Sequence, residues 1–103
     1  MSTNQIFAQC KPNAETDTVL YLSTGNVVAN MWMGNQSGED YVRIAIVPHG
    51  NPLSNESYIA YDTPIATNYI FYLQTLCFGV GDTVYVRSRM GTSSFTVTGQ
   101  MLP

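Results

Sequence analysis

The sequence predicts an all-β protein with about eight antiparallel strands in a jelly-roll-like β-sandwich, and three observations lead to this fold class. Apolar and polar residues alternate with a period of two in most segments, as a pleated strand requires. Turn-forming Gly, Pro, Asn and Asp residues separate these segments at intervals of roughly ten residues. No window of about ten residues has the period of a helix. An immunoglobulin-like sandwich is the alternative, although the span between the two cysteines lacks a tryptophan placed as that fold requires.

The expected strands divide the chain into an N-terminal arm or first strand, residues 1–12, and a single β-sandwich domain, residues 13–103. The first strand is weak because its apolar residues are few. The last strand, residues 93–101, alternates most regularly and is expected to have one solvent-facing side. The strands are expected at residues 5–11, 18–23, 27–34, 41–47, 58–63, 68–76, 83–88 and 93–101.

The second and third strands are predicted to form a hairpin. Gly25 and Asn26 make a turn dipeptide between residues 18–23 and residues 27–34, and both of these runs are rich in strand-forming residues. The run 18–23 carries apolar residues on both faces, which predicts a central position in a sheet.

The fourth strand, residues 41–47, leads into a long connection in the middle of the chain. Val42, Ile44 and Ile46 form its apolar face. Pro48 removes a backbone donor, so the strand ladder ends there, and the connection extends to residue 57. One long central connection suits a jelly roll. The loop is either a binding or assembly element or a plain crossover between two sheets.

Size and composition limit the function classes. A chain of 103 residues forms one domain. With only four Lys and Arg residues it cannot make a broad phosphate-binding patch, so nucleic acid is not an expected partner. The net charge of −3 disfavours an anionic membrane surface, and no apolar run approaches the ~20 residues of a membrane span. The N-terminal segment has no signal-peptide pattern, so no secretion address is expected.

Catalytic and metal-binding chemistry is not expected. Cys10 and Cys77 are either two small core side chains or a disulfide. A zinc site would need both cysteines, His49 and a carboxylate to converge without a CxxC pair, so no metal is predicted. His49 is interpreted as a solvated turn residue, and Asp62 and Asp82 as turn formers. No nucleophile elbow, phosphate loop or metalloprotease motif occurs, so we expect neither an enzyme nor a cofactor.

One long segment carries a family resemblance. The run RIAIVPHGNPLSNESYIAYDTPI, residues 43–65, is followed by GDTVYV at residues 81–86 and by FTVTG at residues 95–99. This pattern resembles small β-sandwich structural proteins of tailed bacteriophages, over roughly residues 19 to 100 of this chain. Cys77 and the aromatic run 69–72 depart from it. The resemblance implies a virion protein that is assembled in the host cytoplasm.

The resemblance leaves the place in the virion open. A capsid decoration or cement protein is favoured over a tail, baseplate or fibre-associated module, because the chain has no coiled coil or collagen-like stalk. The expected partners are other virion proteins and further copies of the chain, with a trimer as one homo-oligomer that fits. Docking is predicted at the arm 1–12, at the loop 48–55 and at exposed tyrosines. The residues proposed for docking are His49, Asn51, Leu53, Tyr58 and Tyr61.

A carbohydrate-binding adhesin domain is the alternative function. Such domains offer aromatic faces beside amides and carboxylates, and Trp32 with Tyr72 could supply stacking rings for a host surface glycan. Tyr58 or Tyr61 could contribute as well. The competing explanation is that these aromatic residues fill the core or an interface between copies.

Overall fold

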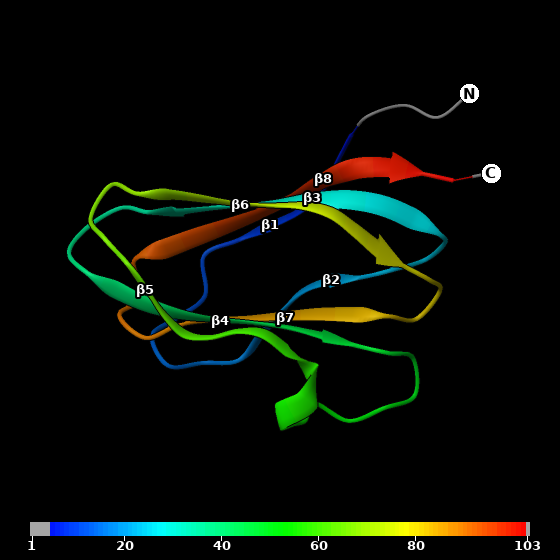
Figure 1. Cartoon of the computed structure of the whole chain (residues 1–103), viewed down its shortest axis with the longest axis horizontal. Helices are drawn as coiled ribbons and strands as arrows, with labels where there is room; N and C mark the ends of the chain where they lie inside the picture. The colour runs from blue at the N-terminus through cyan, green and yellow to red at the C-terminus, as the bar shows by residue number, and fades with distance from the viewer. Residues whose placement is uncertain (1–4, 103) are drawn as a thin grey trace.

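Two four-stranded antiparallel sheets pack face to face in the computed structural model, which describes residues 5–102 (Figure 1). The predicted all-β sandwich is confirmed. Among these residues the helical content is a single 3₁₀ turn, η1 (Asn55–Ser57). The strands are β1 (Gln5–Cys10), β2 (Thr18–Leu22), β3 (Val27–Asn35), β4 (Asp40–Val47), β5 (Tyr58–Ile65), β6 (Ile70–Phe78), β7 (Thr83–Ser88) and β8 (Ser93–Met101).

The strand order is that of a jelly roll. Sheet A has the order β1-β8-β3-β6, and sheet B has the order β2-β7-β4-β5. The pairs β4–β5, β3–β6, β2–β7 and β1–β8 are therefore nested, as in one long hairpin that has been rolled into two layers. The long loop 48–57 lies at the tip of this hairpin. The order excludes the immunoglobulin-like alternative.

The predicted hairpin between the second and third strands is wrong. β2 pairs with β7 in sheet B, whereas β3 pairs with β6 and β8 in sheet A, so the chain crosses between sheets at Gly25 and Asn26. β2 is also an edge strand and not a central one. Its register shifts at Leu20, so that both Leu20 and Tyr21 pack on the core while Val19 stays exposed.

The core lies between the sheets and comes mainly from the two central strands of each. Strands β3, β8 and β7 alternate buried with less buried residues, as the sequence predicts. In β4 the alternation breaks at Ala45, which is buried with Val47, so Ile46, predicted on the apolar face with Val42 and Ile44, is only partly buried. Removal of these side chains from water is the main favourable contribution to folding. The buried apolar residues of the core cluster are Leu20, Val27, Ala29, Met31, Met33, Val42, Ile44, Ile65, Phe78, Val84, Val86, Phe95 and Val97.

A buried carboxylate joins the two sheets at one end of the sandwich. Oδ2 of Asp40 accepts hydrogen bonds from the hydroxyls of Ser88 at 2.5 Å and Ser93 at 2.6 Å, which lie in sheet B and sheet A. Oδ1 accepts from the backbone N–H groups of Tyr41 and Met90, at 2.8 Å and 2.9 Å. Burial alone would raise the pKa of Asp40, but these hydrogen bonds outweigh burial and lower it.

A buried amide makes a second connection at the same end. Nδ2 of Asn35, in β3, donates to the carbonyl oxygens of Ile65 at 3.0 Å and Ala66 at 3.2 Å, at the end of β5. Its Oδ1 accepts from the hydroxyl of Thr92 at 2.8 Å. We call these groups, Asn35, Asp40, Ser88 and Ser93, the polar clasp. Buried polar groups that are fully hydrogen-bonded fix one arrangement of the sheets.

Candidate interaction surfaces

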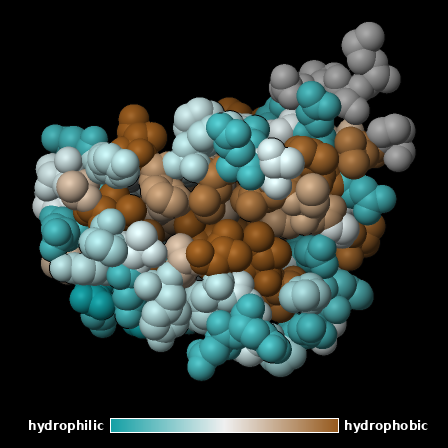
Figure 2. Space-filling model, viewed as in Figure 1, coloured by the Kyte–Doolittle hydropathy of each residue, from teal (hydrophilic) through white to brown (hydrophobic). Residues whose placement is uncertain are grey.

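The sandwich is open along the edge formed by β5 and β6. Phe71, Leu73 and Leu76 of β6 pack against the core yet stay partly exposed, and Ile70 is 68 % exposed. A hollow of about 310 Å³ also lies on this edge, lined by Thr63, Pro64, Ile65, Ala66, Tyr69 and Phe71. In the view of Figure 1, β5 and β6 pass in front of their sheets, and Figure 2 shows a band of apolar surface between the layers. We call this region the open edge.

The strand β6 has little of the protection that edge strands commonly carry. Its sequence, IFYLQTLCF, contains neither a charged residue nor a proline. By contrast, β5 carries Asp62 and Pro64. The ladder between β6 and β3 is interrupted at a bulge, where Thr75 has φ 58° and its N–H donates to Oδ1 of Asn30 at 3.1 Å. Soluble proteins commonly use charges, prolines or bulges on edge strands to prevent pairing. β6 has a bulge but no charge or proline, as is also true of the edge strands β1 and β2, so its protection against contact with another chain is only partial.

The loop 48–57 is held against a neighbouring turn. The N–H of His49 donates to Oδ1 of Asp82 at 3.0 Å, and Oδ2 accepts from the N–H of Gly79 at 2.7 Å. The imidazole lies over Gly81, which has φ +86°, and a Cβ there would come within 2.0 Å of the ring. Asp82 therefore acts in a turn, as expected, whereas His49 is exposed but packs on that turn.

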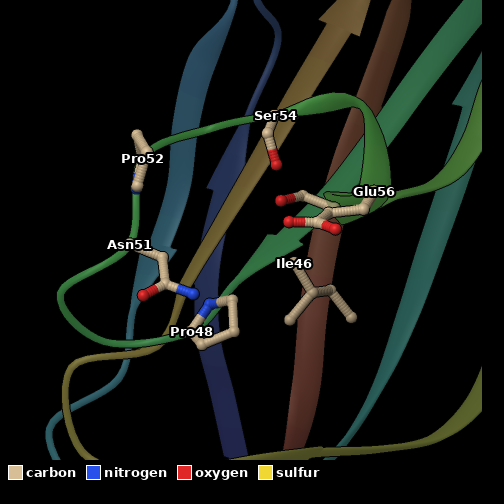
Figure 3. Close-up of a pocket in the computed structure, with 7 residues that line it drawn as sticks. Ile46, Pro48, Asn51, Pro52, Ser54 and Glu56 are labelled. Atoms are coloured by element: carbon tan, nitrogen blue, oxygen red, sulfur yellow. The ribbon is translucent and has the colours of Figure 1, made fainter.

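A hollow of about 290 Å³ lies under this loop (Figure 3). Ile46 provides an apolar wall, and Figure 3 shows the side chains of Ser54 and Glu56 directed into the space above it. Asn51, one of the predicted docking residues, also lines it. We call this space the loop hollow, and its lining residues are Ile46, Pro48, Asn51, Pro52, Ser54, Glu56 and Ser57.

Beside the loop, two predicted docking residues meet. Tyr58 and Tyr61 lie edge to face with ring centroids 5.0 Å apart, and the guanidinium of Arg43 lies 4.1 Å from the centre of the Tyr61 ring. Arg43 Nε donates to Oδ1 of Asp62 at 2.7 Å, and its Nη2 donates to Oδ2 at 3.2 Å. These bonds hold the pKa of Asp62 below its usual value. The interpretation of Asp62 as a turn former is wrong, because it lies within β5 at a bulge with φ 50°.

The five proposed docking residues are therefore only partly brought together. Tyr58 and Tyr61 are in contact, Asn51 lines the loop hollow, and His49 lies over the turn at Gly81. Leu53 is half-buried within the loop. Residues 1–4 of the predicted docking arm lie outside the described residues, and the rest of the arm includes β1, which pairs with β8.

The outer face of sheet A brings together the two residues proposed for glycan stacking. Trp32 and Tyr72 are register partners on β3 and β6, with ring centroids 3.9 Å apart and an interplanar angle of 31°. The indole N–H donates to the hydroxyl of Thr98 at 3.2 Å. Thr96 lies opposite Trp32 on β8, and a Cβ at Gly34 would meet no atom within 4 Å, so space is open near the indole. The sequence analysis named both residues, but it could not predict that they are register partners, because register depends on how distant strands pair.

The two cysteines lie on the two edge strands of sheet A and are not bonded to each other. Cys10 of β1 is half-buried against the core, and burial raises the pKa of its thiol. Cys77 of β6 is exposed. The interpretation of both as core side chains is therefore wrong for Cys77, and the alternative disulfide does not form.

Neither a metal-binding cluster nor a membrane-spanning helix is found within the described part of the chain. Among residues 5–102, no three or more His, Cys, Asp or Glu side chains gather in a way that could hold a metal ion. In the same range no helix has the length and apolar character needed to cross a membrane.

Comparisons of this chain with protein families, curated proteins and solved structures give no match. The chain's own surfaces therefore carry the evidence for its function.

Proposed function

We propose that this chain is a structural protein of a bacteriophage virion, a capsid decoration or cement protein that docks in many copies. The observation that carries the proposal is the open edge, where apolar side chains of an uncharged edge strand lie exposed. An exposed apolar patch beside a weakly protected strand is costly for an isolated protein and useful for one whose neighbours cover it. The resemblance to phage structural proteins gives the kind of assembly.

Such a protein stabilises a particle by mass action. It binds the assembled lattice and not its separated parts, so each copy adds its binding free energy to that of the lattice. Contacts between neighbouring copies across the open edge would form a homo-oligomer, and linked copies bind together more tightly than single ones. A tail, baseplate or fibre-associated location uses the same contacts at a lower copy number.

Sedimentation with particles assembled without this protein tests the role. The purified chain is mixed with these particles, which are then pelleted, and the bound copies per particle are counted. A copy number that matches the capsid lattice supports decoration. A few copies in a multiple of three or six indicate the tail axis, and a lack of binding contradicts the virion role.

A matched pair of variants tests the open edge itself. Ile70→Lys places a charge on β6, and Val80→Lys places the same charge on a comparably exposed apolar residue in the turn before β7. Because a lysine protects an edge strand from pairing, Ile70→Lys should weaken particle binding about tenfold or more, and Val80→Lys should leave it unchanged. Equal binding by both variants would place the contact elsewhere.

The contact between Trp32 and Tyr72 favours a second candidate function, recognition of a neutral host glycan. Sugar rings stack their C–H faces on aromatic side chains and use hydroxyls and amides for hydrogen bonds. The aromatic pair lies beside Thr96 and Thr98, and Gln9 Nε2 donates to the Thr96 hydroxyl at 3.3 Å.

Binding of the purified chain to host polysaccharide tests this candidate. We expect saturable binding that Trp32→Ala abolishes and that Tyr61→Ala, a change of an exposed aromatic on the other sheet, leaves intact. Absence of saturable binding, or equal loss in both variants, contradicts a glycan site at Trp32.

A further inference from the structure

We infer that the loop hollow receives a lysine side chain from the particle protein on which this chain docks. This inference rests on the proposed virion function and names the chemistry of the partner. It is carried by the position of Glu56, by the lining of the hollow and by the way in which the loop is fixed.

Glu56 differs from most carboxylates of the chain because no side chain of the described residues pairs with it. Glu15 is likewise without a side-chain partner, but it lies on an exposed turn and does not line the loop hollow. The other five acidic residues are engaged by Arg87 (Asp17), the Tyr41 hydroxyl (Glu39), the polar clasp (Asp40), Arg43 (Asp62) and backbone N–H groups (Asp82).

Among residues 5–102, no lysine or arginine pairs with Glu56. Arg43 and Arg89 both approach Asp62, at 2.7 Å and 3.7 Å, and Arg87 lies 4.0 Å from Asp17. Lys11 forms no ion pair within the described residues. Because no cation of residues 5–102 pairs with Glu56, we assign its positive partner to another molecule.

The lining of the hollow matches a lysine. Ile46, Pro48 and Pro52 offer apolar contact to a four-carbon stem, as long charged side chains commonly find on protein surfaces. An ammonium has three donors, and the carboxylate of Glu56 and the hydroxyl of Ser54, both directed into the space, are available acceptors. The volume of about 290 Å³ is at the small end of ligand sites, which suits one side chain.

The same lining disfavours an arginine. A guanidinium gains most where a flat stacking partner accompanies its contact with a carboxylate. No aromatic ring lines the loop hollow, since Tyr58 and Tyr61 line a separate hollow with Asn55.

The hollow is also formed before the partner arrives. The N–H of Asn51 donates to the carbonyl of Pro48 at 3.1 Å, and that of Ser57 donates to Ser54 at 3.0 Å. The contact of His49 with the turn at Asp82 fixes the first half of the loop. A preformed site loses less conformational entropy on binding, which favours a specific contact.

Binding of the full chain to particles assembled without it tests the inference. Glu56→Gln removes the charge and keeps the shape, and Glu15→Gln is the matched control because Glu15 is equally unpaired but lies outside the hollow. We expect Glu56→Gln to weaken binding about tenfold, Glu15→Gln to change it less than twofold, and Glu56→Lys to abolish it.

Acetylation of lysines on the particle tests the occupant. Because acetylation removes the positive charge of lysine, it should weaken binding of the wild-type chain, while Glu56→Gln should lose little more on acetylated particles. If the wild-type chain binds and Glu56→Gln binds equally well, or if acetylation weakens both chains to the same extent, the inference is overturned alone. If the wild-type chain does not bind particles, both the inference and the proposed function are contradicted.

Discussion

The two lateral edges of the sandwich differ in how the two sheets are joined there. On the β1/β2 edge, Phe7 stacks on Tyr21 across the two sheets with ring centroids 5.4 Å apart, and Tyr21 also contacts Phe78, the last residue of β6, at 6.3 Å. On the open edge no such stack forms, and Phe71 and Leu73 remain partly exposed. There the sheets are joined through the polar clasp, in which Asn35 of β3 bonds to the end of β5.

The contrast separates stability from contact within one fold. The aromatic stack bridges the sheets and half-buries Phe7 and Tyr21, while Ile6, Val19 and Leu22 on the same edge stay exposed. A clasp of hydrogen bonds at one end holds the layers together without covering the apolar strip beside it, so the strip stays available. We expect changes in the clasp and at the β1/β2 edge to alter unfolding, and changes on the open edge to alter association.

The largest expected effect comes from breaking the clasp with Asp40→Ala. The change leaves the hydroxyls of Ser88 and Ser93 and two backbone N–H groups without their acceptor in a fully buried site. We expect the free energy of unfolding to fall by about 4 kcal/mol, because buried polar groups without partners are costly. Urea denaturation of the variant and the wild-type chain measures this difference. A loss below about 1 kcal/mol would mean that apolar contacts alone hold the sheets on this side.

The clasp also predicts a loss of stability in acid. The hydrogen bonds lower the pKa of Asp40 in the folded protein, so its stabilising contribution is complete above the ordinary aspartate pKa of about 3.9. It disappears as the pH falls through the lower pKa of the folded state. Asp62 has a lowered pKa too, so the wild-type chain should be compared with Asp40→Asn. The difference in their unfolding free energies should shrink between pH 7 and about pH 2, and a constant difference would contradict the assignment.

Truncating one apolar side chain on each edge compares how much the two edges contribute to the free energy of unfolding. Phe7→Ala removes the stack on Tyr21 at the β1/β2 edge and should cost about 2 kcal/mol of unfolding free energy, since the ring is half-buried. Leu73→Ala on the open edge should cost only about 1 kcal/mol, because leucine is smaller, is likewise half-buried and has no stacked aromatic partner. Denaturation curves of the two variants test the order. A larger loss for Leu73→Ala would show that the open edge is as well packed as the other.

Part of the fold was predictable from the sequence. The strands at 83–88 and 93–101 coincide with β7 and β8, and the long loop 48–57 lies at the tip of the rolled hairpin, as a jelly roll requires. These segments have an undisturbed period of two, and local patterning decides them.

The failures have a common physical cause, which is that strand register is set by distant pairing. A bulge at Leu20 turns two successive residues of β2 inward, so alternation suggested a central strand where an edge strand exists. Similarly, Asp62 looks like a turn residue but is paired with Arg43 at a bulge, and Cys77 looks apolar but lies on an exposed edge. Which strands form the edges follows from the order of the whole sheet, and that order decides where the open edge lies.

The smallest expected effect uses the two cysteines, which mark the two edge strands of sheet A. Cys77 on β6 is exposed, whereas Cys10 on β1 is half-buried and its thiol pKa is raised by burial. The thiolate is the reactive form, so at neutral pH Cys77 should react with iodoacetamide more than tenfold faster than Cys10. Mass spectrometry of the peptides after timed labelling measures both rates. Equal rates would mean that the β1/β2 edge opens as readily as the other.

The same labelling, repeated on assembled particles, shows whether the open edge is covered by a partner or remains exposed. If copies or particle proteins cover β6, the rate at Cys77 should fall on assembly while the rate at Cys10 stays nearly constant. Cys10→Ser and Cys77→Ser chains provide the control for peptide assignment. Unchanged labelling of Cys77 in assembled particles would place the contact away from β6, whereas protection of Cys77 alone would show that the edge without aromatic closure is the one that the assembly covers.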